Sequence, residues 1–397
     1  MASLLVTASR MIITPAGGPT RVLSPGYVRA ENGVIVEVGE GRPPTTLGPP
    51  DADLADGLLA PGLVDIQVNG FFGYDMVDAD EVGWHTVVSR LPETGVTAFL
   101  PTFITAPVET QAAALRRTRD LLPNLPDGTR VLGVHLEGPF LSGKRKGAHN
   151  AAHLTDPAPD AIATLLETGL VRLVTLAPER DGALDAIRTL TRAGVVVSVG
   201  HSDATADQVA AAADAGARKV THIFNAQTGV HHRDPGVAVQ ALIDDRLSPG
   251  LILDLHHVAA KVAELVFRAA PGRVVLVTDA ASSAGMPPGT YELGGEPITM
   301  PAEGPPLRAD GTLAGSGLRL DDAVGNAVRI GIDEVTAIDA ATRTPADLIG
   351  RADLGRIVPG AAADLVWLGP DHPAQTNHRA RTTWVNGQKV FGGGSGS

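Results

Sequence analysis

The sequence contains no cysteine among its 397 residues. Disulfide bonds and thiolate metal sites are therefore excluded, and any bound metal ion must be held by His, Asp, Glu or neutral oxygen ligands. The sequence also lacks any run of about 18 apolar residues, so no membrane-spanning helix is expected.

Positive charge is in short supply as well. The chain has 32 basic and 44 acidic residues, and its formal net charge is −12. This balance argues against non-specific binding of nucleic acid or of anionic membranes, because both require a basic surface. A small anionic ligand is compatible with it, since a few local donors can hold one.

The two ends of the chain lack other signals. The opening "MASLLVTASRMIITPAGG" has too short an apolar part, and no charged lead, for a secretory signal. We therefore expect a cytoplasmic protein. The last residues, 392–397, read "GGGSGS", which is typical of a flexible linker outside the fold.

What is present at both ends is β structure. Short β-branched runs such as "GYVRAENGVIVEVGE" and "RTTWVNGQKVF" are each broken by an Asn-Gly pair, at Asn32-Gly33 and Asn386-Gly387. Asn-Gly between such runs predicts a β-hairpin.

The middle of the chain alternates between buried-type strands and Ala-rich or Leu-rich helical stretches such as "ETQAAALRRTRDLL", "DAIATLLETG" and "ATADQVAAAADAG". Eight strand candidates are visible: "GLVDIQVNG", "GVTAFLPTF", "VLGVHLEGPF", "VRLVTLAPE", "VVVSVGHS", "KVTHIFNA", "GLILDLHH" and "VVLVTDAAS". This alternation indicates an α/β protein with a parallel sheet, and eight units favour a closed (β/α)8 TIM barrel. Periodicity alone does not separate a barrel from a doubly wound sheet.

Polar residues stand where these strands end. In a barrel, catalytic side chains lie at the C-terminal ends of the strands. The candidates are Asp65, Gln67, Asn69, Glu137, His201, His222, His256, His257 and Asp279.

Each acidic or amide candidate also has a structural interpretation. Asp65 or Gln67 could satisfy loop amides or cap a helix. Glu137 could pair with a cation in 144–146, and Asp279 could cap a helix beginning in "AASSAG".

The histidines have structural interpretations too. His201 could flank a helix capped by Ser202 or Asp203, and His222 could be a satisfied core histidine.

Taken together, the structural interpretations weaken. Glu137, His201 and His222 would converge on one rim of a closed barrel, and two imidazoles with one carboxylate are a common ligand set for catalytic Zn²⁺ with an open position for water. Asp279, on the last strand, would then be placed to accept a proton from that water.

The ordered motifs "PGLVDIQVNG", "HLEGPF", "GHSDAT", "THIFNA", "HHRDPG" and "LVTDA" resemble N-acetylglucosamine-6-phosphate deacetylases of the amidohydrolase superfamily. The resemblance covers nearly the whole chain. It implies a (β/α)8 barrel over 61–357 and a small β-sandwich domain built from 1–60 and 358–391.

The resemblance also assigns roles. Glu137, His201 and His222 match the metal ligands, Asp279 matches the general base and acid, and His257 matches a histidine that contacts the acetyl carbonyl. The implied cofactor is one divalent metal ion per subunit, with Zn²⁺ expected.

Substrate contacts carry over in the same way. Asn225, Ala226 and Arg233 match positions that hold the sugar phosphate, His149 matches a sugar contact, and Leu313 matches a residue beside the acetyl group. In relatives, the arginine at the position of Arg233 can reach the neighbouring subunit's site, which implies a homodimer; the sequence leaves open which subunit's site it serves here.

Many superfamily members carry His-x-His on the first strand and bind two ions, whereas this chain has Gln67 and Asn69. Amide oxygens are poor Zn²⁺ ligands beside imidazole, so these two residues are expected to be the remnant of a second site that is weak or absent.

Five positions depart from the family pattern, namely Gln227, Leu255, His256, Gly317 and Gly325. Leu255 stands where a small residue is usual, and we expect it to fill space on the rim facing the sugar. The departures leave the metal ligands intact but put the preferred amino sugar in doubt.

The predicted activity is removal of the N-acetyl group from N-acetylglucosamine-6-phosphate, giving glucosamine-6-phosphate and acetate. Three alternatives remain open: a deacetylase of the galactosamine isomer or another amino sugar, a superfamily deaminase or cyclic amidase, and a non-catalytic sugar-phosphate binding protein. The expected partner is a small-molecule amino-sugar phosphate, and neither a nucleic acid nor a membrane is expected as a partner.

Overall fold

The computed structural model describes residues 3–15, 18–369 and 378–393, so the last four residues of the predicted linker lie outside the described part. All eight predicted barrel strands are present, and they are parallel. In barrel order they are β8 (Leu63–Val68), β11 (Val96–Ile104), β12 (Arg130–Val131) continued by β13 (Val134–Glu137), β14 (Val171–Leu176), β15 (Val196–Val199), β16 (Lys219–Val220), β17 (Ser248–Leu251) and β18 (Val275–Leu276).

The first and last strands meet, which decides between a barrel and an open sheet. The Asp279 N–H donates to the Gln67 carbonyl at 2.9 Å, and the Asn69 N–H donates to the Ala280 carbonyl at 2.9 Å. These bonds close the ring, so the predicted (β/α)8 barrel is confirmed.

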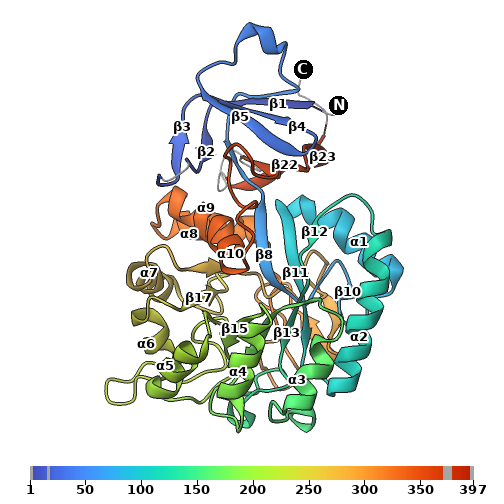
Figure 1. Cartoon of the computed structure of the whole chain (residues 1–397), viewed down its shortest axis with the longest axis vertical. Helices are drawn as coiled ribbons and strands as arrows, with labels where there is room; N and C mark the ends of the chain where they lie inside the picture. Colours follow the sequence, from blue (N-terminus) through green and yellow to red (C-terminus); the bar gives the residue numbers. More distant parts are fainter. Residues whose placement is uncertain (1–2, 16–17, 370–377, 394–397) are drawn as a thin grey trace.

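Helices cover the outside of the barrel (Figure 1). The three helical stretches predicted above correspond to α2, α3 and α5, and α5 begins with a capping box on Thr205, so neither Ser202 nor Asp203 is its cap. The helices are α1 (Glu81–Arg90), α2 (Val108–Leu121), α3 (Pro159–Leu166), α4 (Ala183–Arg192), α5 (Ala206–Ala215), α6 (Gly236–Ile243), α7 (Ala260–Ala269), α8 (Leu320–Arg329), α9 (Glu334–Ala341) and α10 (Arg343–Leu348). None of the described helices is long and apolar enough to cross a membrane.

Each helix buries one apolar stripe against the strands. In α4 the buried residues are Ala183, Ala186, Ile187 and Leu190, which recur every three or four positions and so lie on one face. Those residues join the strand side chains in one large hydrophobic core.

Two further sheets, seen at the top of Figure 1, use strands from both chain ends. The four-stranded sheet has the order β5 (Val34–Glu40), β4 (Gly26–Glu31), β1 (Ser3–Ala8), β6 (Ala52–Leu54). The six-stranded sheet has the order β23 (Gln388–Phe391), β22 (Arg379–Val385), β21 (Leu365–Gly369), β7 (Leu58–Pro61), β2 (Met11–Ile13), β3 (Arg21–Leu23).

Both predicted Asn-Gly hairpins are confirmed. Asn32-Gly33 joins β4 to β5 and Asn386-Gly387 joins β22 to β23, with positive φ at all four residues. The two sheets share a second hydrophobic core, to which Val6 and Ile35 contribute from one sheet and Met11, Leu59 and Leu365 from the other.

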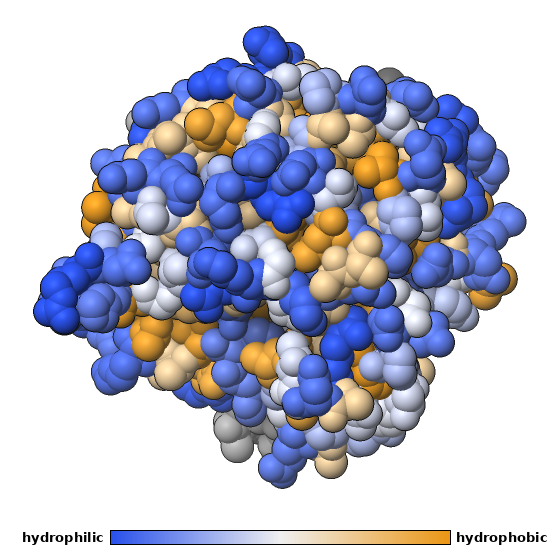
Figure 2. All heavy atoms as spheres, turned by 90° about the horizontal axis from the view of Figure 1, so that it is seen from below, coloured by the Kyte–Doolittle hydropathy of each residue, from blue (hydrophilic) through white to orange (hydrophobic). Residues whose placement is uncertain are grey.

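The barrel presents its N-terminal end to these sheets, because Arg130, at the start of β12, bonds Asp364 beside β21. The C-terminal strand ends therefore point away from them, downward in Figure 1. A hairpin of β19 (Gly289–Leu293) and β20 (Glu296–Met300) lies at this far end, where β9 (Gly70–Phe71) also pairs with β10 (Tyr74–Asp75). Figure 2 views the molecule from this end, whose surface is mostly hydrophilic with separate hydrophobic groups.

Candidate active site

Three predicted ligands come together at the C-terminal strand ends. Glu137 ends β13, His201 follows β15 and His222 follows β16. The His222 Nε2 atom lies 3.1 Å from Glu137 Oε1, and His201 Nε2 lies 3.4 Å from the same oxygen. One atom from each residue lies within 4.8 Å of the other two, and this is the single group of at least three His, Cys, Asp or Glu residues so arranged in the described chain.

The donors fit a metal ion. The His201 Nδ1 atom lies 3.0 Å from the Arg145 carbonyl, which can only accept, so the ring proton is on Nδ1 and the lone pair of Nε2 faces the cluster. The His201 Nε2 atom lies 3.1 Å from His222 Nε2 and 3.4 Å from Glu137 Oε1. A cation at their common centre would turn these crowded acceptors into ligands.

The backbone is strained at two of the predicted ligands and at Asp279. His201 (φ 46°), His222 (φ 24°) and Asp279 (φ 50°) all have left-handed backbone conformations, which non-glycine residues adopt at an energetic cost. All three come two or three residues after the end of a parallel strand, so a sharp turn there directs each side chain toward the cluster.

The electrostatic environment of the cluster keeps the Glu137 carboxylate ionised, as a cation ligand must be. Burial raises the pKa of Glu137, but its close contacts with the His201 and His222 rings outweigh burial and hold that pKa well below its usual value. Burial lowers the pKa of His222, and the neighbouring Glu137 carboxylate outweighs this and raises it. The carboxylate is therefore ionised and faces the imidazoles.

Asp279 lies next to this cluster and is buried. Its Oδ1 accepts hydrogen bonds from Asn69 Nδ2 at 2.8 Å and from Gln67 Nε2 at 3.1 Å. Burial first, and the charge of Glu137 second, raise the pKa of Asp279. A carboxyl group with a raised pKa is suited to accept a proton and to hold it until it is passed on.

The two amides of β8 act here as donors. Gln67 Nε2 also donates to Glu137 Oε1 at 3.2 Å, so this amide bridges Glu137 and Asp279. The Gln67 Oε1 and Asn69 Oδ1 atoms are buried without a hydrogen-bond partner. Gln67 and Asn69, the predicted remnant of a second metal site, thus donate their amide hydrogens to Glu137 and Asp279.

His149 and His257 complete the polar wall. His149 Nδ1 lies 2.8 Å from Thr105 Oγ1, and burial followed by the charge of His201 keeps its pKa well below the usual value, so the ring is neutral. His257 Nδ1 lies 2.7 Å from Asp254 Oδ2. Asp254 was missed in the sequence, where its only signal is a position three residues before His257.

These residues line one cavity of about 260 Å³. It contains the predicted residues Asn69, Glu137, His149, His201, His222, Asn225, Ala226, His257, Asp279 and Leu313. Sequence reasoning missed its other lining residues, which include Ile104, Ile252, Leu293 and Thr312. Leu293 and Thr312 reach the cavity from the β19–β20 hairpin and the segment after it, and no motif marks them.

Arg233 does not line this cavity. It lies on the exposed segment between β16 and α6, and its Nη1 atom is 2.7 Å from His232 Nε2. Gln67 is buried below the cavity and does not line it either. The other predicted site residues are brought together.

One expectation about the departures from the family pattern is wrong, namely that Leu255 fills space on the rim facing the sugar. Leu255 does not face the cavity but packs against the barrel core, and it has a left-handed backbone (φ 66°). His256 is exposed and lines a separate shallow hollow with Asp322 and Arg329. Neither side chain therefore narrows the space around a sugar.

Of the structural interpretations considered for the acidic residues, those for Glu137 and Asp279 fail and the one for Asp65 holds. Lys144 and Arg145 pair with Asp203 and not with Glu137, and no helix begins at Asp279 among the described residues. Asp65, in contrast, has the structural role considered for it, because it accepts a hydrogen bond from Thr278 Oγ1 at 2.6 Å deep in the barrel.

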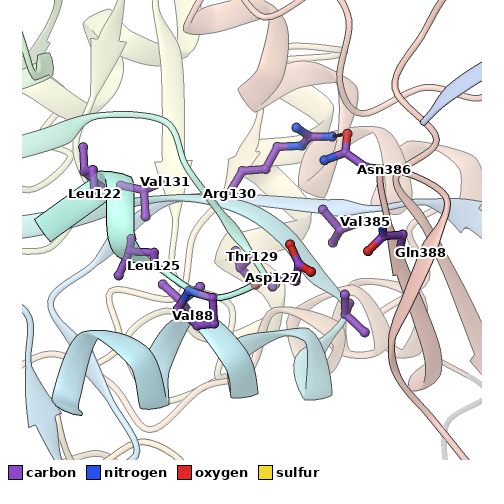
Figure 3. A pocket seen from close by; sticks show the side chains of 13 residues that line it. Val88, Leu122, Leu125, Asp127, Thr129, Arg130, Val131, Val385, Asn386 and Gln388 are labelled. Atoms are coloured by element: carbon purple, nitrogen blue, oxygen red, sulfur yellow. Dashed lines mark hydrogen bonds between the residues drawn. The ribbon is translucent and has the colours of Figure 1, made fainter. Parts of the chain in front are cut away.

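A second hollow, of about 320 Å³, lies at the opposite end of the barrel between α1 and the β22–β23 hairpin (Figure 3). Val88, Leu122 and Val385 line it, and its one cation, Arg130, is paired with Asp364. It contains no histidine and no unpaired cation, so it offers no comparable chemistry.

Comparison with known proteins agrees with this geometry. Residues 58–390 match the profile of the amidohydrolase family. The chain is 37% identical to N-acetylglucosamine-6-phosphate deacetylase of Vibrio furnissii over 91% of this chain and 89% of the relative. It is 36% identical to N-acetylgalactosamine-6-phosphate deacetylase of Escherichia coli O157:H7 over 96% of this chain and 98% of the relative.

A solved structure of similar shape is a mutant N-acetyl-D-glucosamine-6-phosphate deacetylase of Mycobacterium smegmatis in complex with N-acetyl-D-glucosamine-6-phosphate. It has a TM-score of 0.90 and 33% identity, covering 98% of this chain and 100% of that one. The deacetylase of Thermotoga maritima has a TM-score of 0.86 and 29% identity over the same shares of the two chains.

Proposed function

This chain belongs to the amidohydrolase family and to its N-acetylglucosamine-6-phosphate deacetylases, and on that premise we propose that its cavity removes the acetyl group of N-acetylglucosamine-6-phosphate. The products are glucosamine-6-phosphate and acetate. The observation that carries the proposal is the convergence of Glu137, His201 and His222 beside Asp279 in one cavity.

Glu137, His201 and His222 would hold one divalent metal ion, and the His₂Glu set favours Zn²⁺. When bound, such an ion polarises the acetamide carbonyl and lowers the pKa of water. Gln67 and Asn69 support a single ion, because their amide nitrogens already donate to carboxylates.

Asp279 carries the proton. A water oxygen bonds to the acetamide carbon while Asp279 accepts the water proton, and its raised pKa suits it to hold that proton. When the carbon–nitrogen bond breaks, Asp279 passes the proton to the leaving amine.

The rest of the cavity orients the sugar. His257 faces the acetyl carbonyl, Leu313 contacts the acetyl methyl group, and His149 contacts the sugar ring. The turn at Asn225 and Ala226 holds the phosphate; Ala226 has a left-handed backbone (φ 50°).

Arg233 would complete the phosphate site of a neighbouring subunit in a homodimer. Support comes from its exposed position outside its own cavity. Charge-assisted hydrogen bonds from arginine would let an acidic protein bind a dianionic substrate. We further propose that the enzyme acts in the cytoplasm.

Acetate release tests the proposal, with metal content measured on the same preparation. N-acetylglucosamine-6-phosphate, its galactosamine isomer and unphosphorylated N-acetylglucosamine are compared at equal concentration. We expect kcat/KM to be at least about 100-fold higher with the phosphate than without it, since charge-assisted phosphate contacts contribute a few kcal/mol. Equal rates with and without phosphate would contradict the assignment.

The galactosamine isomer is the second candidate substrate, because the relative that matches 96% of this chain is an N-acetylgalactosamine-6-phosphate deacetylase. The two sugars differ at one hydroxyl group, so the same comparison decides between them. A deaminase, cyclic amidase or purely binding function receives no support from these relatives.

A further inference from the structure

We propose that Asp254 is a positioning residue for His257, and that its carboxylate fixes both the orientation of the imidazole and the nitrogen that carries the ring proton. The inference rests on the proposed function, in which His257 faces the acetyl carbonyl. It adds a residue that neither the motifs nor the metal cluster identify.

Asp254 builds the turn on which His257 stands. It follows β17, and its Oδ1 accepts the backbone N–H groups of His256 at 2.9 Å and His257 at 2.8 Å. Leu255 lies between them with a left-handed backbone. The carboxylate thereby holds the strained turn, and its second oxygen is left for the imidazole.

That second oxygen binds the ring. Asp254 Oδ2 lies 2.7 Å from His257 Nδ1, and both side chains are more than nine-tenths buried. Burial raises the pKa of Asp254, but the hydrogen bond and charge of His257 outweigh burial and lower it, so the carboxyl group is ionised. An ionised carboxylate can only accept, and the ring proton is therefore on Nδ1.

The tautomer decides what His257 offers the cavity. With the proton on Nδ1, the neutral ring presents a lone pair at Nε2 and cannot donate to a carbonyl oxygen. It donates there only as an imidazolium, whose positive charge the Asp254 carboxylate stabilises from behind. The ring interacts electrostatically with both Asp254 and Asp279, and of these two only Asp254 is hydrogen-bonded to it.

The chain offers a matched control. Asp322 lines the same shallow hollow as Asp254 but pairs with Arg379 and makes no contact with His257. Asp254→Asn and Asp322→Asn thus each remove one carboxylate from the lining of this hollow. Only Asp254→Asn changes the hydrogen-bond partner of the His257 ring. In Asp254→Asn the amide oxygen can keep both backbone bonds while its NH₂ group faces Nδ1, which moves the ring proton to Nε2.

The test uses the purified Zn²⁺-loaded protein labelled with ¹⁵N-histidine, and a His257→Gln variant identifies the resonances of His257. We expect wild type and Asp322→Asn to show a protonated Nδ1, and Asp254→Asn to show a protonated Nε2. We also expect Asp254→Asn to keep its metal and a KM within about threefold of wild type, while kcat falls at least about tenfold.

A wild-type His257 ring that carries its proton on Nε2 and none on Nδ1 would overturn the proposal, as would an Asp254→Asn enzyme with kcat within about twofold of wild type. If Asp254→Asn fails to fold, the wild-type spectrum still decides the tautomer. If wild type releases no acetate from any sugar, the proposed function fails, and the spectrum judges the Asp254–His257 pair separately.

Discussion

Gln67 links the predicted metal-binding cluster to Asp279, since its amide group donates to both Glu137 and Asp279. The sequence indicates only that this position is not a histidine. The hydrogen bonds give the amide a role of its own, because they hold Asp279, the proposed general base, at a fixed distance from Glu137, a proposed metal ligand.

Asp279→Asn should leave metal content near that of wild type and lower kcat at least about 1,000-fold. The amide oxygen can still accept from Asn69 and Gln67, but the side chain cannot take a proton at neutral pH. Metal analysis and acetate release measure the two effects. A variant that keeps most of its activity would show that another group is the base.

His222→Ala should lose metal and activity together, because it removes one of three ligands. His256→Ala is the matched control, since His256 is an exposed histidine outside the cluster. Metal content after dialysis, with and without a chelator, measures the effect. Full metal occupancy in His222→Ala would contradict the ligand set.

The β19–β20 hairpin is the element that brings Leu293 to the cavity, and Asp75 anchors its tip. Asp75 Oδ2 accepts the Gly294 N–H at 2.6 Å. Gly294 has φ 60°, and a Cβ atom there would lie 2.4 Å from Ile104 Cδ1, so only glycine fits this turn. The position of the hairpin therefore depends on contacts with β10 and β11.

Burial raises the pKa of Asp75 to about 7. The folded protein then holds a proton that the unfolded chain releases near pH 4, so this stability contribution is complete below about pH 4 and is lost as the pH rises through about 7. After allowance for partial exposure to water, we expect the loss to be about 1 kcal/mol.

Urea unfolding at pH 5 and pH 7.5 measures this loss, with Asp75→Asn compared with wild type. The variant should show a smaller decrease in the free energy of unfolding between the two pH values. Equal decreases in both proteins would exclude Asp75 as the source.

The barrel and the two end sheets are joined by a charged contact. Arg130 donates to both oxygens of Asp364, at 2.8 and 3.0 Å. It also donates to Asn386, as Figure 3 shows. The Asp364 side chain is only 2% exposed. We propose that the chain divides into a β-sandwich of 1–60 and 358–391 and a barrel of 61–357, with this pair at their junction.

Arg130→Ala should lower the free energy of unfolding by about 3 kcal/mol, because it leaves a buried carboxylate without its partner. Arg116→Ala is the control, since Arg116 pairs with Glu167 on the surface and should contribute less than about 1 kcal/mol. Denaturant unfolding compares the two variants. Equal losses would show that the junction is no more sensitive than the surface.

Local sequence patterns were enough to predict the eight strands, both Asn-Gly hairpins and the convergence of Glu137, His201 and His222. Alternation of apolar runs reflects burial, and Asn-Gly reflects a backbone that needs positive φ; both are properties of a few neighbouring residues. Glu137, His201 and His222 could be found because barrel strands deliver their ends to one rim.

Only the tertiary structure decided which atoms meet. It placed Leu255 in the core and Arg233 outside the cavity of its own chain, and it paired Asp254 with His257 and Gln67 with two carboxyl groups. These partners lie on different strands and loops, or depend on which way a strained turn directs a side chain. The sequence by itself determined which residues end each strand, and long-range packing determined what each of them touches.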